Sequence, residues 1–416
     1  MQPVDYTTLL ALCHELRRDW LPARIEQVYQ RDRHTLSLAL RTLGDRGWLT
    51  LSWHPQAARL CLDQPPSRDP DTFTLSDQLR HQLKGLALIA LHPIQPWERV
   101  IDLAIAKRPG EVPLYHLFLE IMGKYSNLVL TDNQQQIITV AHQVNAHQSR
   151  VRTIQTSQPY QLPPPILADQ PSLSEGFRDW QGRVNLIPGK ISQQLLKSYR
   201  GVSPMVVKHL LNKAGISPDI DNQILAPEQW QRLFQAWQTW LTRLEHHEFS
   251  GELTESGFTV LRDGQAPDAL QSRSRQDSPI NELISDYYGQ RLGQARFQQL
   301  RHHLQQKLTT LITKLQQKVQ TFEQRLEEAA NANQYQQQAD LLMAYLHQGQ
   351  PGLREITLPD FDHGTPVTIT LQPDKNLIQN AQKLYKHQQK LNRAQAAVRP
   401  LLGEVTSELN YLFQVD

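Results

Sequence analysis

Cysteine is nearly absent from this chain. Only Cys13 and Cys61 occur among its 416 residues. Two thiols are too few for a disulfide framework or for a structural zinc site with four cysteine ligands. Both have apolar neighbours in the sequence, so we expect them to be free thiols packed in a hydrophobic core.

The chain also lacks long hydrophobic runs and a strong excess of one charge. No apolar stretch approaches the roughly 20 residues that span a bilayer, and no basic stretch followed by an apolar core opens the chain. These absences predict a cytoplasmic protein with no membrane partner. The 43 Lys and Arg against 41 Asp and Glu leave a net charge of only +2. Any nucleic-acid surface must therefore come from local clustering of basic residues.

What the chain does have is length and regular patterning. A chain of 416 residues exceeds what one hydrophobic core usually serves, so we expect two to four domains. Residues 1–160 alternate short helical and strand patterns, which predicts an α+β domain. The order helix, strand, turn, strand appears in it twice, as in a degenerate internal repeat. The expected helices are 6–20 and 75–83, and the expected strands are 24–29, 35–41, 48–53, 87–92, 100–106 and 128–130.

Proline and helical periodicity divide the rest of the chain. A stiff segment over 160–165 marks a boundary, and residues 170–245 have a helical pattern. Residues 246–290 are polar and irregular, which indicates a connecting segment. From 291 to 416, two long helices flank a compact insert at about 335–375, in which alternation predicts a small β element. We expect Pro400 to kink or interrupt the second of these helices.

The first long helix carries a heptad-like apolar stripe, which predicts an antiparallel coiled-coil arm with a small head. The stripe consists of Phe297, Leu300, Leu304, Leu308, Leu311, Leu315, Val319, Phe322 and Leu326.

One stretch is more specific than the rest: Glu120-Ile121-Met122-Gly123-Lys124-Tyr125-Ser126-Asn127-Leu128-Val129-Leu130. On physical grounds it predicts strand, turn and strand, because glycine frees the backbone and the Ser and Asn side chains can bond the turn's amides. It also resembles, almost letter for letter, a signature of the NFACT family. That family includes a bacterial ribosome quality-control factor and chains named for fibronectin binding.

Weaker motifs in the family's order extend the resemblance over most of the chain. They are Asp5; His14-Glu15-Leu16 with 23–30; Ser52-Trp53-His54-Pro55 with Ala58-Arg59; Ser149-Arg150-Val151-Arg152 with 160–164; Leu358-Pro359-Asp360-Phe361; and 380–386. The resemblance implies a glycosylase-like α/β amino-terminal domain, a helix-hairpin-helix domain over 170–245 and a coiled-coil arm over 291–416. Family members usually continue into a carboxy-terminal RNA-binding domain, which we do not expect in this sequence.

The resemblance implies a ribosome-associated function without catalysis. The protein would bind stalled large ribosomal subunits that carry peptidyl-tRNA, touch ribosomal RNA, and recruit tRNA, alanyl-tRNA by analogy, for untemplated carboxy-terminal tailing. The peptide bond would form in the ribosome's own centre, so neither a nucleophile nor a cofactor is expected.

Two alternatives stay open. One is a cell-surface adhesin that binds fibronectin, as the family's older name suggests. The other is a nucleic-acid-binding protein related to the DNA glycosylases. Their chemistry needs an amino-terminal proline amine beside a glutamate and a zinc finger. Here the first proline is Pro3, no acid follows it directly, and four cysteines are absent.

Three charged residues match the family's tRNA positions: Asp5, Glu98 and Arg99. Family members commonly have Asp-Arg in place of Glu98-Arg99, so the acid here is one methylene longer. Arg99 would donate to a phosphate or base edge, and Glu98 would orient it or accept from a ribose hydroxyl. A surface ion pair is the alternative for this pair. For Asp5 the alternative is a helix N-cap.

The turn of the signature stretch gives a second candidate RNA contact. Lys124, Ser126 and Asn127 could present a cation and polar groups to RNA, or they could serve folding alone.

A third candidate is the Gly-Val-Ser-Pro segment at 201–204, which resembles the turn of a helix-hairpin-helix. There Gly201 and Ser203 would help free amides at a helix start to bind phosphate, and Lys208 would add charge. A plain helical turn is the alternative.

Basic residues of the arm could touch ribosomal RNA, although a solvated helix face is their simpler interpretation. They are Lys307, Lys314, Lys318, Lys383, Lys386, Lys390 and Arg393.

Overall fold

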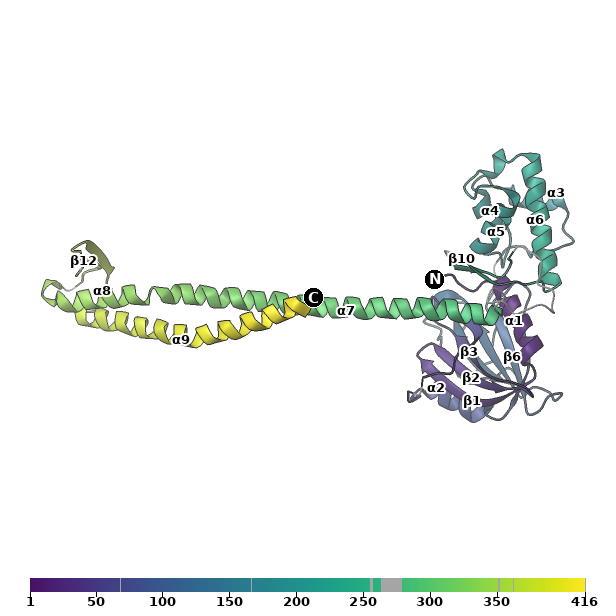
Figure 1. Ribbon diagram of the computed structural model, residues 1–416, viewed down its shortest axis with the longest axis horizontal. Coiled ribbons are helices and arrows are strands. Elements are labelled where there is room, and N and C mark those ends of the chain that lie inside the picture. Colours follow the sequence, from purple (N-terminus) through teal and green to yellow (C-terminus); the bar gives the residue numbers. More distant parts are fainter. Residues whose placement is uncertain are drawn as a thin grey trace. The chain divides into compact units, whose positions relative to one another are not determined.

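The computed structural model of the chain describes residues 1–67, 69–165, 167–254, 257–262, 279–350, 352–361 and 363–415. Its internal contacts divide the chain into two compact units, Met1–Gly293 and Gln294–Asp416 (Figure 1). The first unit holds a large β-sheet and a group of helices, and the second holds long helices with a small hairpin. The α+β class predicted from the sequence is confirmed.

A nine-stranded antiparallel sheet dominates Met1–Gly293. Its order is β4-β3-β2-β1-β5-β6-β7-β8-β9. Each half is a meander that follows one helix, and the halves meet at the β1–β5 pair, so the predicted repeat is present in the topology. The first half comprises α1 Tyr6–Trp20, β1 Ala23–Asp32, β2 Thr35–Arg41, β3 Arg46–Ser52 and β4 Arg59–Asp63. The second half comprises α2 Thr74–Leu83, β5 Ala87–Pro93, β6 Val100–Ala106, β7 Tyr115–Glu120, β8 Asn127–Asp132 and β9 Ile137–Val140.

The two helices pack across the halves. α1 contacts β5 of the second half as well as β4 of its own, and α2 contacts β1 of the first half as well as β9 of its own. α1 begins after Asp5, whose carboxylate accepts from the Thr8 amide at 2.8 Å and so caps the helix. Because of this exchange, the two halves share one hydrophobic core.

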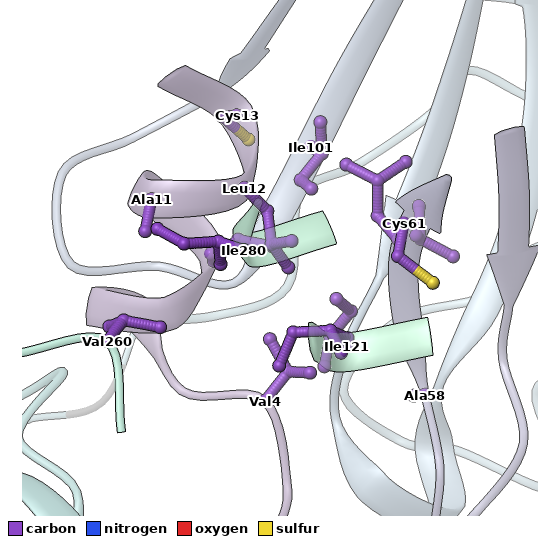
Figure 2. Close-up of a cluster of buried hydrophobic side chains, with 14 of the residues drawn as sticks. Val4, Ala11, Leu12, Cys13, Ala58, Cys61, Ile101, Ile121, Val260 and Ile280 are labelled. Carbon is purple, nitrogen blue, oxygen red and sulfur yellow. The ribbon is translucent and has the colours of Figure 1, made fainter. Parts of the chain in front are cut away.

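Figure 2 shows part of this core. Leu12 and Cys13 of α1 lie among buried side chains that include Cys61 of β4 and Ile101 of β6, and Ile280 at the start of α7 (Ile280–Ala330) is drawn with them. Both cysteines are free and buried, as predicted. Burial raises the pKa of Cys13 to about 12 and that of Cys61 to about 11, since a thiolate is disfavoured away from water. Both thiols therefore stay protonated at neutral pH, the less reactive form.

Helices within the predicted range 170–245 complete the first unit. Their packing is aromatic: Trp180, Trp237 and Trp240 are buried, and the last two rings meet edge to face with centroids 5.0 Å apart. In the predicted connecting segment 246–290, a short hairpin forms, residues 263–278 lie outside the described part, and α7 begins at Ile280. The bounds are α3 Phe177–Val184, α4 Ile191–Ser198, α5 Pro204–Ala214, the 3-10 turn Asn222–Ile224, α6 Pro227–Glu245, β10 Glu252–Thr254 and β11 Gly257–Thr259.

The second unit contains most of α7 and a small hairpin that packs against two further helices. α8 and α9 lie side by side (Figure 1), and Leu341, Leu358 and Ile369 form the centre of their small core with the hairpin. The predicted β element is confirmed. Pro400 lies inside α9, which continues without interruption. The bounds are α8 Ala332–Ala344, the 3-10 turn Leu346–Gln348, β12 Glu355–Pro359, β13 Pro366–Thr370 and α9 Leu377–Val415.

Only part of the predicted apolar stripe of α7 is packed against other residues. Phe322 of α7 packs with Val398 and Val405 of α9 in a second small core. Earlier on α7 the structure buries Ile312, whereas its neighbour Leu311 is 51% exposed. Three earlier residues of the stripe are exposed as well: Phe297, Leu300 and Leu304. The coiled-coil arm stays a prediction.

Candidate functional site

The loop between β5 and β6 presents the predicted pair Glu98-Arg99. Trp97 precedes the pair with φ +67°, an unusual conformation for an aromatic residue. Its ring is held by Tyr6, with centroids 4.9 Å apart, and by Trp240, with centroids 5.6 Å apart. Packing therefore fixes a strained backbone directly before the two charged residues.

The turn between α4 and α5 presents the second predicted group. Gly201 has φ +75°, a conformation that glycine adopts without strain. Ser203 is the N-cap of α5, and its hydroxyl accepts from the Val206 amide at 3.1 Å. Sequence and structure agree on a turn followed by a helix here, and the assignment as a helix-hairpin-helix stays a prediction.

The fold brings these two groups together. A Cβ added to Gly201 would lie 2.9 Å from Trp97 Cε3, so only glycine fits against the indole without a shift. Glu98 Oε1 lies 3.6 Å from Arg200 Nη1 in an ion pair. The Ser203 hydroxyl donates to Asp5 Oδ2 at 2.5 Å. We call this contact between the loop 97–99, Asp5 and the turn 200–203 the seam.

The carboxylate of Asp5 serves both ends of the seam. One oxygen caps α1 and the other accepts from Ser203, which itself caps α5. The helix N-cap that sequence analysis offered as the alternative role of Asp5 is therefore present. At α5, the amide of Val206 is bonded within the chain, while Lys208 is exposed on the helix surface.

Burial and neighbouring charges shift the pKa values of Glu98 and Arg99 in opposite directions. Burial raises the pKa of Glu98 above its usual value, and the nearby guanidinium groups of Arg200 and Arg99 partly offset this. Burial likewise lowers the pKa of Arg99, with the carboxylates of Asp5 and Glu98 opposing it. Arg99 still carries its charge, because arginine stays protonated in proteins. The seam is thus a half-buried group of two cations and two anions.

Arg200 is the seam residue that sequence analysis missed. It stands directly before Gly201, which was a candidate, but no spacing relates position 200 to position 98. The only available signal was its place beside a predicted phosphate-binding turn.

The turn of the signature stretch is built differently. It forms a 3-10 turn, Gly123–Tyr125, between β7 and β8. Ser126 accepts from the Met122 amide at 2.9 Å, and Asn127 bonds both backbone groups of His142 at 2.8 and 2.9 Å. Both side chains are buried, so they serve the turn itself. Strand, turn and strand were predicted correctly, and an RNA contact stays a prediction that concerns mainly the exposed Lys124.

In Gln294–Asp416, three of the predicted basic residues line one hollow of about 470 Å³. Lys383, Lys386 and Lys390 lie on one face of α9, beside Tyr335, and no carboxylate lines this hollow. None of the three lysines makes an ion pair with another described residue. The remaining candidates are exposed on α7 and α9: Lys307, Lys314, Lys318 and Arg393.

Two classes of site find no support in the described ranges. No group of three or more His, Cys, Asp and Glu side chains there could hold a metal ion. Nor is any described helix both long and apolar enough to cross a bilayer.

Known proteins resemble this chain along nearly its whole length. It is 25% identical over 418 residues to the Rqc2 homolog RqcH of Bacillus subtilis (strain 168), an alignment that covers 97% of this chain and 70% of that protein. It is also 25% identical over 415 residues to the Rqc2 homolog RqcH of Streptococcus pneumoniae serotype 2, which covers 97% of this chain and 69% of that one.

A solved structure shares the fold. The fibrinogen binding protein from Staphylococcus aureus aligns with a TM-score of 0.52 and 20% identity, over 68% of this chain and 98% of that one. The family model described as NFACT N-terminal and middle domains matches residues 5–416. On this match the chain belongs to the NFACT family.

Proposed function

We propose that this protein acts in ribosome quality control as an RNA-binding factor. It binds large ribosomal subunits that are blocked by peptidyl-tRNA and recruits a tRNA, by analogy alanyl-tRNA, for untemplated tailing of the stalled peptide. Membership of the NFACT family and relatives named RqcH support the general role. The tRNA step rests on the residues of this chain.

The observation that carries the proposal is the seam. Asp5 is distant in the sequence from the adjacent pair Glu98-Arg99, yet the three residues lie in one place beside Ser203 and Arg200. A guanidinium next to fixed carboxylates suits RNA, because arginine can donate to phosphates and base edges while a carboxylate accepts from a ribose hydroxyl.

The protein, as proposed, works by positioning and performs no chemistry of its own. The Cys13 and Cys61 thiols are buried with raised pKa values, which is consistent with this. No cofactor is proposed.

Contact with ribosomal RNA is proposed for the second unit. Lys383, Lys386 and Lys390, which pair with no described carboxylate, gather beside a hollow that no described carboxylate lines, which favours phosphate groups as partners. Such contacts are sequence-independent and strongly dependent on salt.

Sedimentation tests the proposal on the ribosome, with tagged protein expressed in cells. We expect it to travel with large subunits that carry peptidyl-tRNA, and sequencing of the copurifying RNA to show enrichment of one or two tRNA species. Confinement to the ribosome-free fractions, with no tRNA enriched, contradicts the proposal.

An adhesin remains the second candidate, because the matched solved structure is named for fibrinogen binding. Protease treatment of intact cells separates the two functions. Loss of the protein while cytosolic markers stay intact supports adhesion. A glycosylase-like enzyme is tested by borohydride trapping on damaged duplex DNA, for which we expect no covalent adduct.

A further inference from the structure

We infer that Arg200 is a positioning residue of the tRNA site, holding Glu98 in place from across the seam. This rests on the proposed tRNA function and names a residue that the sequence motifs did not single out. Arg200 would act through Glu98, without touching RNA itself.

The geometry of the pair carries the inference. Arg200 Nη1 lies 3.6 Å from Glu98 Oε1, and the two side chains are only 15% and 19% exposed. A pair this sheltered from water is screened less than a surface pair. The backbone on both sides is held in place, because Trp97 before Glu98 and Gly201 after Arg200 press against each other with positive φ angles.

The two side chains have few other partners among the described residues. Glu98 Oε1 and Arg200 Nε are both buried, and neither has a hydrogen-bond partner among the described residues. The pair is thus bound by charge and little else, and each residue is the main partner of the other. Removing Arg200 would leave a half-buried carboxylate facing Arg99 alone, free to turn toward it. The other oxygen, Glu98 Oε2, is bonded to no described residue and remains available to a ribose hydroxyl.

The length of the side chain at position 98 fits this role. An aspartate would end one C–C bond earlier, about 1.5 Å, and would fall short of Arg200. Glutamate at this position is therefore matched to an arginine on the far side of the seam. It follows that shortening Glu98 should weaken the site in the same way as removing Arg200.

A role in merely joining the two sides of the seam is the competing explanation. Contacts that do not involve Arg200 already join them. Ser203 donates to Asp5, Trp240 Nε1 donates to Thr7 Oγ1 at 3.3 Å, and the Trp97 ring packs on Trp240. The two sides of the seam should therefore remain in contact when Arg200 is replaced, and only the position of the Glu98 side chain should change.

The experiment measures equilibrium binding of purified full chain to total cellular tRNA, with a thermal melt of every variant. The set is Arg200→Gln, Arg200→Lys, Glu98→Gln, Glu98→Asp and the double variant Glu98→Gln/Arg200→Gln. Arg31→Gln is the matched control, because Arg31 Nη1 pairs with Asp63 Oδ2 at 3.1 Å in the sheet, in a pair of similar burial whose side chains are 23% and 16% exposed.

We expect Arg200→Gln and Glu98→Gln each to weaken tRNA binding by a factor on the order of ten, with the double variant no weaker than either single one. Arg200→Lys should restore part of the affinity, and Glu98→Asp should resemble Arg200→Gln. Arg31→Gln should change the melt and leave tRNA binding unchanged.

Three outcomes overturn the inference. Unchanged binding in a folded Arg200→Gln variant makes the residue a bystander. Multiplying losses in the double variant make Arg200 and Glu98 independent contacts. A drop in binding that follows the melting temperature across all variants, the Arg31 control included, makes the role structural. If wild-type protein binds no tRNA at all, the proposed function itself fails, which is a different result from any pattern among the variants.

Discussion

The seam and the signature turn are the two places in Met1–Gly293 where the sequence predicted RNA contacts, and they are built in opposite ways. The turn is local: Ser126 bonds a residue four positions away, and Asn127 bonds one fifteen positions away. The seam is long-range, because Asp5 and Ser203 are 198 positions apart. In the turn the polar side chains are buried and satisfied. In the seam charged groups are half-buried and only partly satisfied.

The stretch that is easiest to recognise in the sequence therefore differs from the place that the structure favours as an RNA site. The turn is the most recognisable stretch of the chain, yet its buried polar side chains have structural partners. The seam has weak sequence motifs, yet it gathers charges whose hydrogen-bonding capacity is not used up within the protein. Unused capacity of this kind is costly for folding, and a ligand that supplies the missing partners is one explanation for it.

The largest effect that would separate the two sites is expected from Arg99→Ala. Loss of a guanidinium that donates to phosphate or a base edge should weaken tRNA binding by roughly 1.5–3 kcal/mol. Arg99→Lys should restore only part, since an ammonium lacks the planar fork. The measurement is tRNA and large-subunit copurification, and subunit binding should survive because the second unit carries it.

Arg108→Ala is the matched control, since Arg108 is exposed in the loop that follows β6. A well-folded Arg99→Ala variant that keeps its full complement of tRNA would reduce Glu98-Arg99 to a structural ion pair.

A smaller effect, on stability alone, is expected from Asn127→Ala. The change leaves the His142 and Leu128 backbone groups without their side-chain partner, and should lower the free energy of unfolding by about 1–3 kcal/mol. The folded fraction should bind tRNA as the wild type does. Chemical denaturation gives the first quantity and tRNA titration the second.

Asn133→Ala, at an exposed position after β8, is the control for that variant. Loss of tRNA binding by folded Asn127→Ala protein would place the turn in the RNA site and remove the contrast with the seam.

Lowering the pH should change the stability that the seam contributes and leave that of the turn unchanged. This effect should be smaller than those of the substitutions above. The pKa of Glu98 is raised above its usual 4.5 by burial, with Arg200, Arg99 and Asp5 nearby. The folded protein therefore takes up this proton at a higher pH than the unfolded chain does. As pH falls through the folded pKa, wild type should gain stability relative to Glu98→Gln. Melting curves of both proteins between pH 7.5 and 4.5 measure the difference. Curves that stay parallel over the whole range would show that Glu98 titrates as an exposed carboxylate.

The smallest effect is expected from Lys124→Ala. The Lys124 ammonium lies 4.9 Å from the ring centroid of Tyr125, which is itself 70% exposed, so the contact is weak. We expect tRNA binding to stay within about twofold and stability within about 0.5 kcal/mol. Lys107→Ala, at an exposed lysine directly after β6, is the comparison. A loss as large as that of Arg99→Ala would show that the turn contacts RNA after all.

Much of the sheet could be predicted from the sequence, because its signals are local. The helix predicted over 6–20 matches α1, since a capping Asp5 precedes helically spaced leucines and Pro22 follows soon after its end. The strands β4 and β9 were missed. They have five and four residues, and a strand that short offers too little alternation to be recognised.

The site could be predicted only in pieces. Glu98, Gly201 and Asp5 were each singled out, but nothing in a single sequence says that they meet. A positive φ at Trp97 has no local signal either, because it depends on the rings of Tyr6 and Trp240. Register on α7 failed for a related reason. Steps of three and four allow either Leu311 or Ile312 to face inward, and the packing of neighbouring helices decides between them.

Because α1 and α2 each pack on both halves of the sheet, the order of synthesis decides when the core of this domain can form. α1 is finished at Trp20, but one of the strands it packs on, β5, ends only at Pro93. At about 5–20 residues per second, synthesis of the intervening residues takes several seconds. During that interval the apolar face of α1 lacks its full cover, and the first meander cannot close its core alone. The nascent chain therefore exposes an open half-sheet until the second half arrives, and we expect chaperones to bind it during translation.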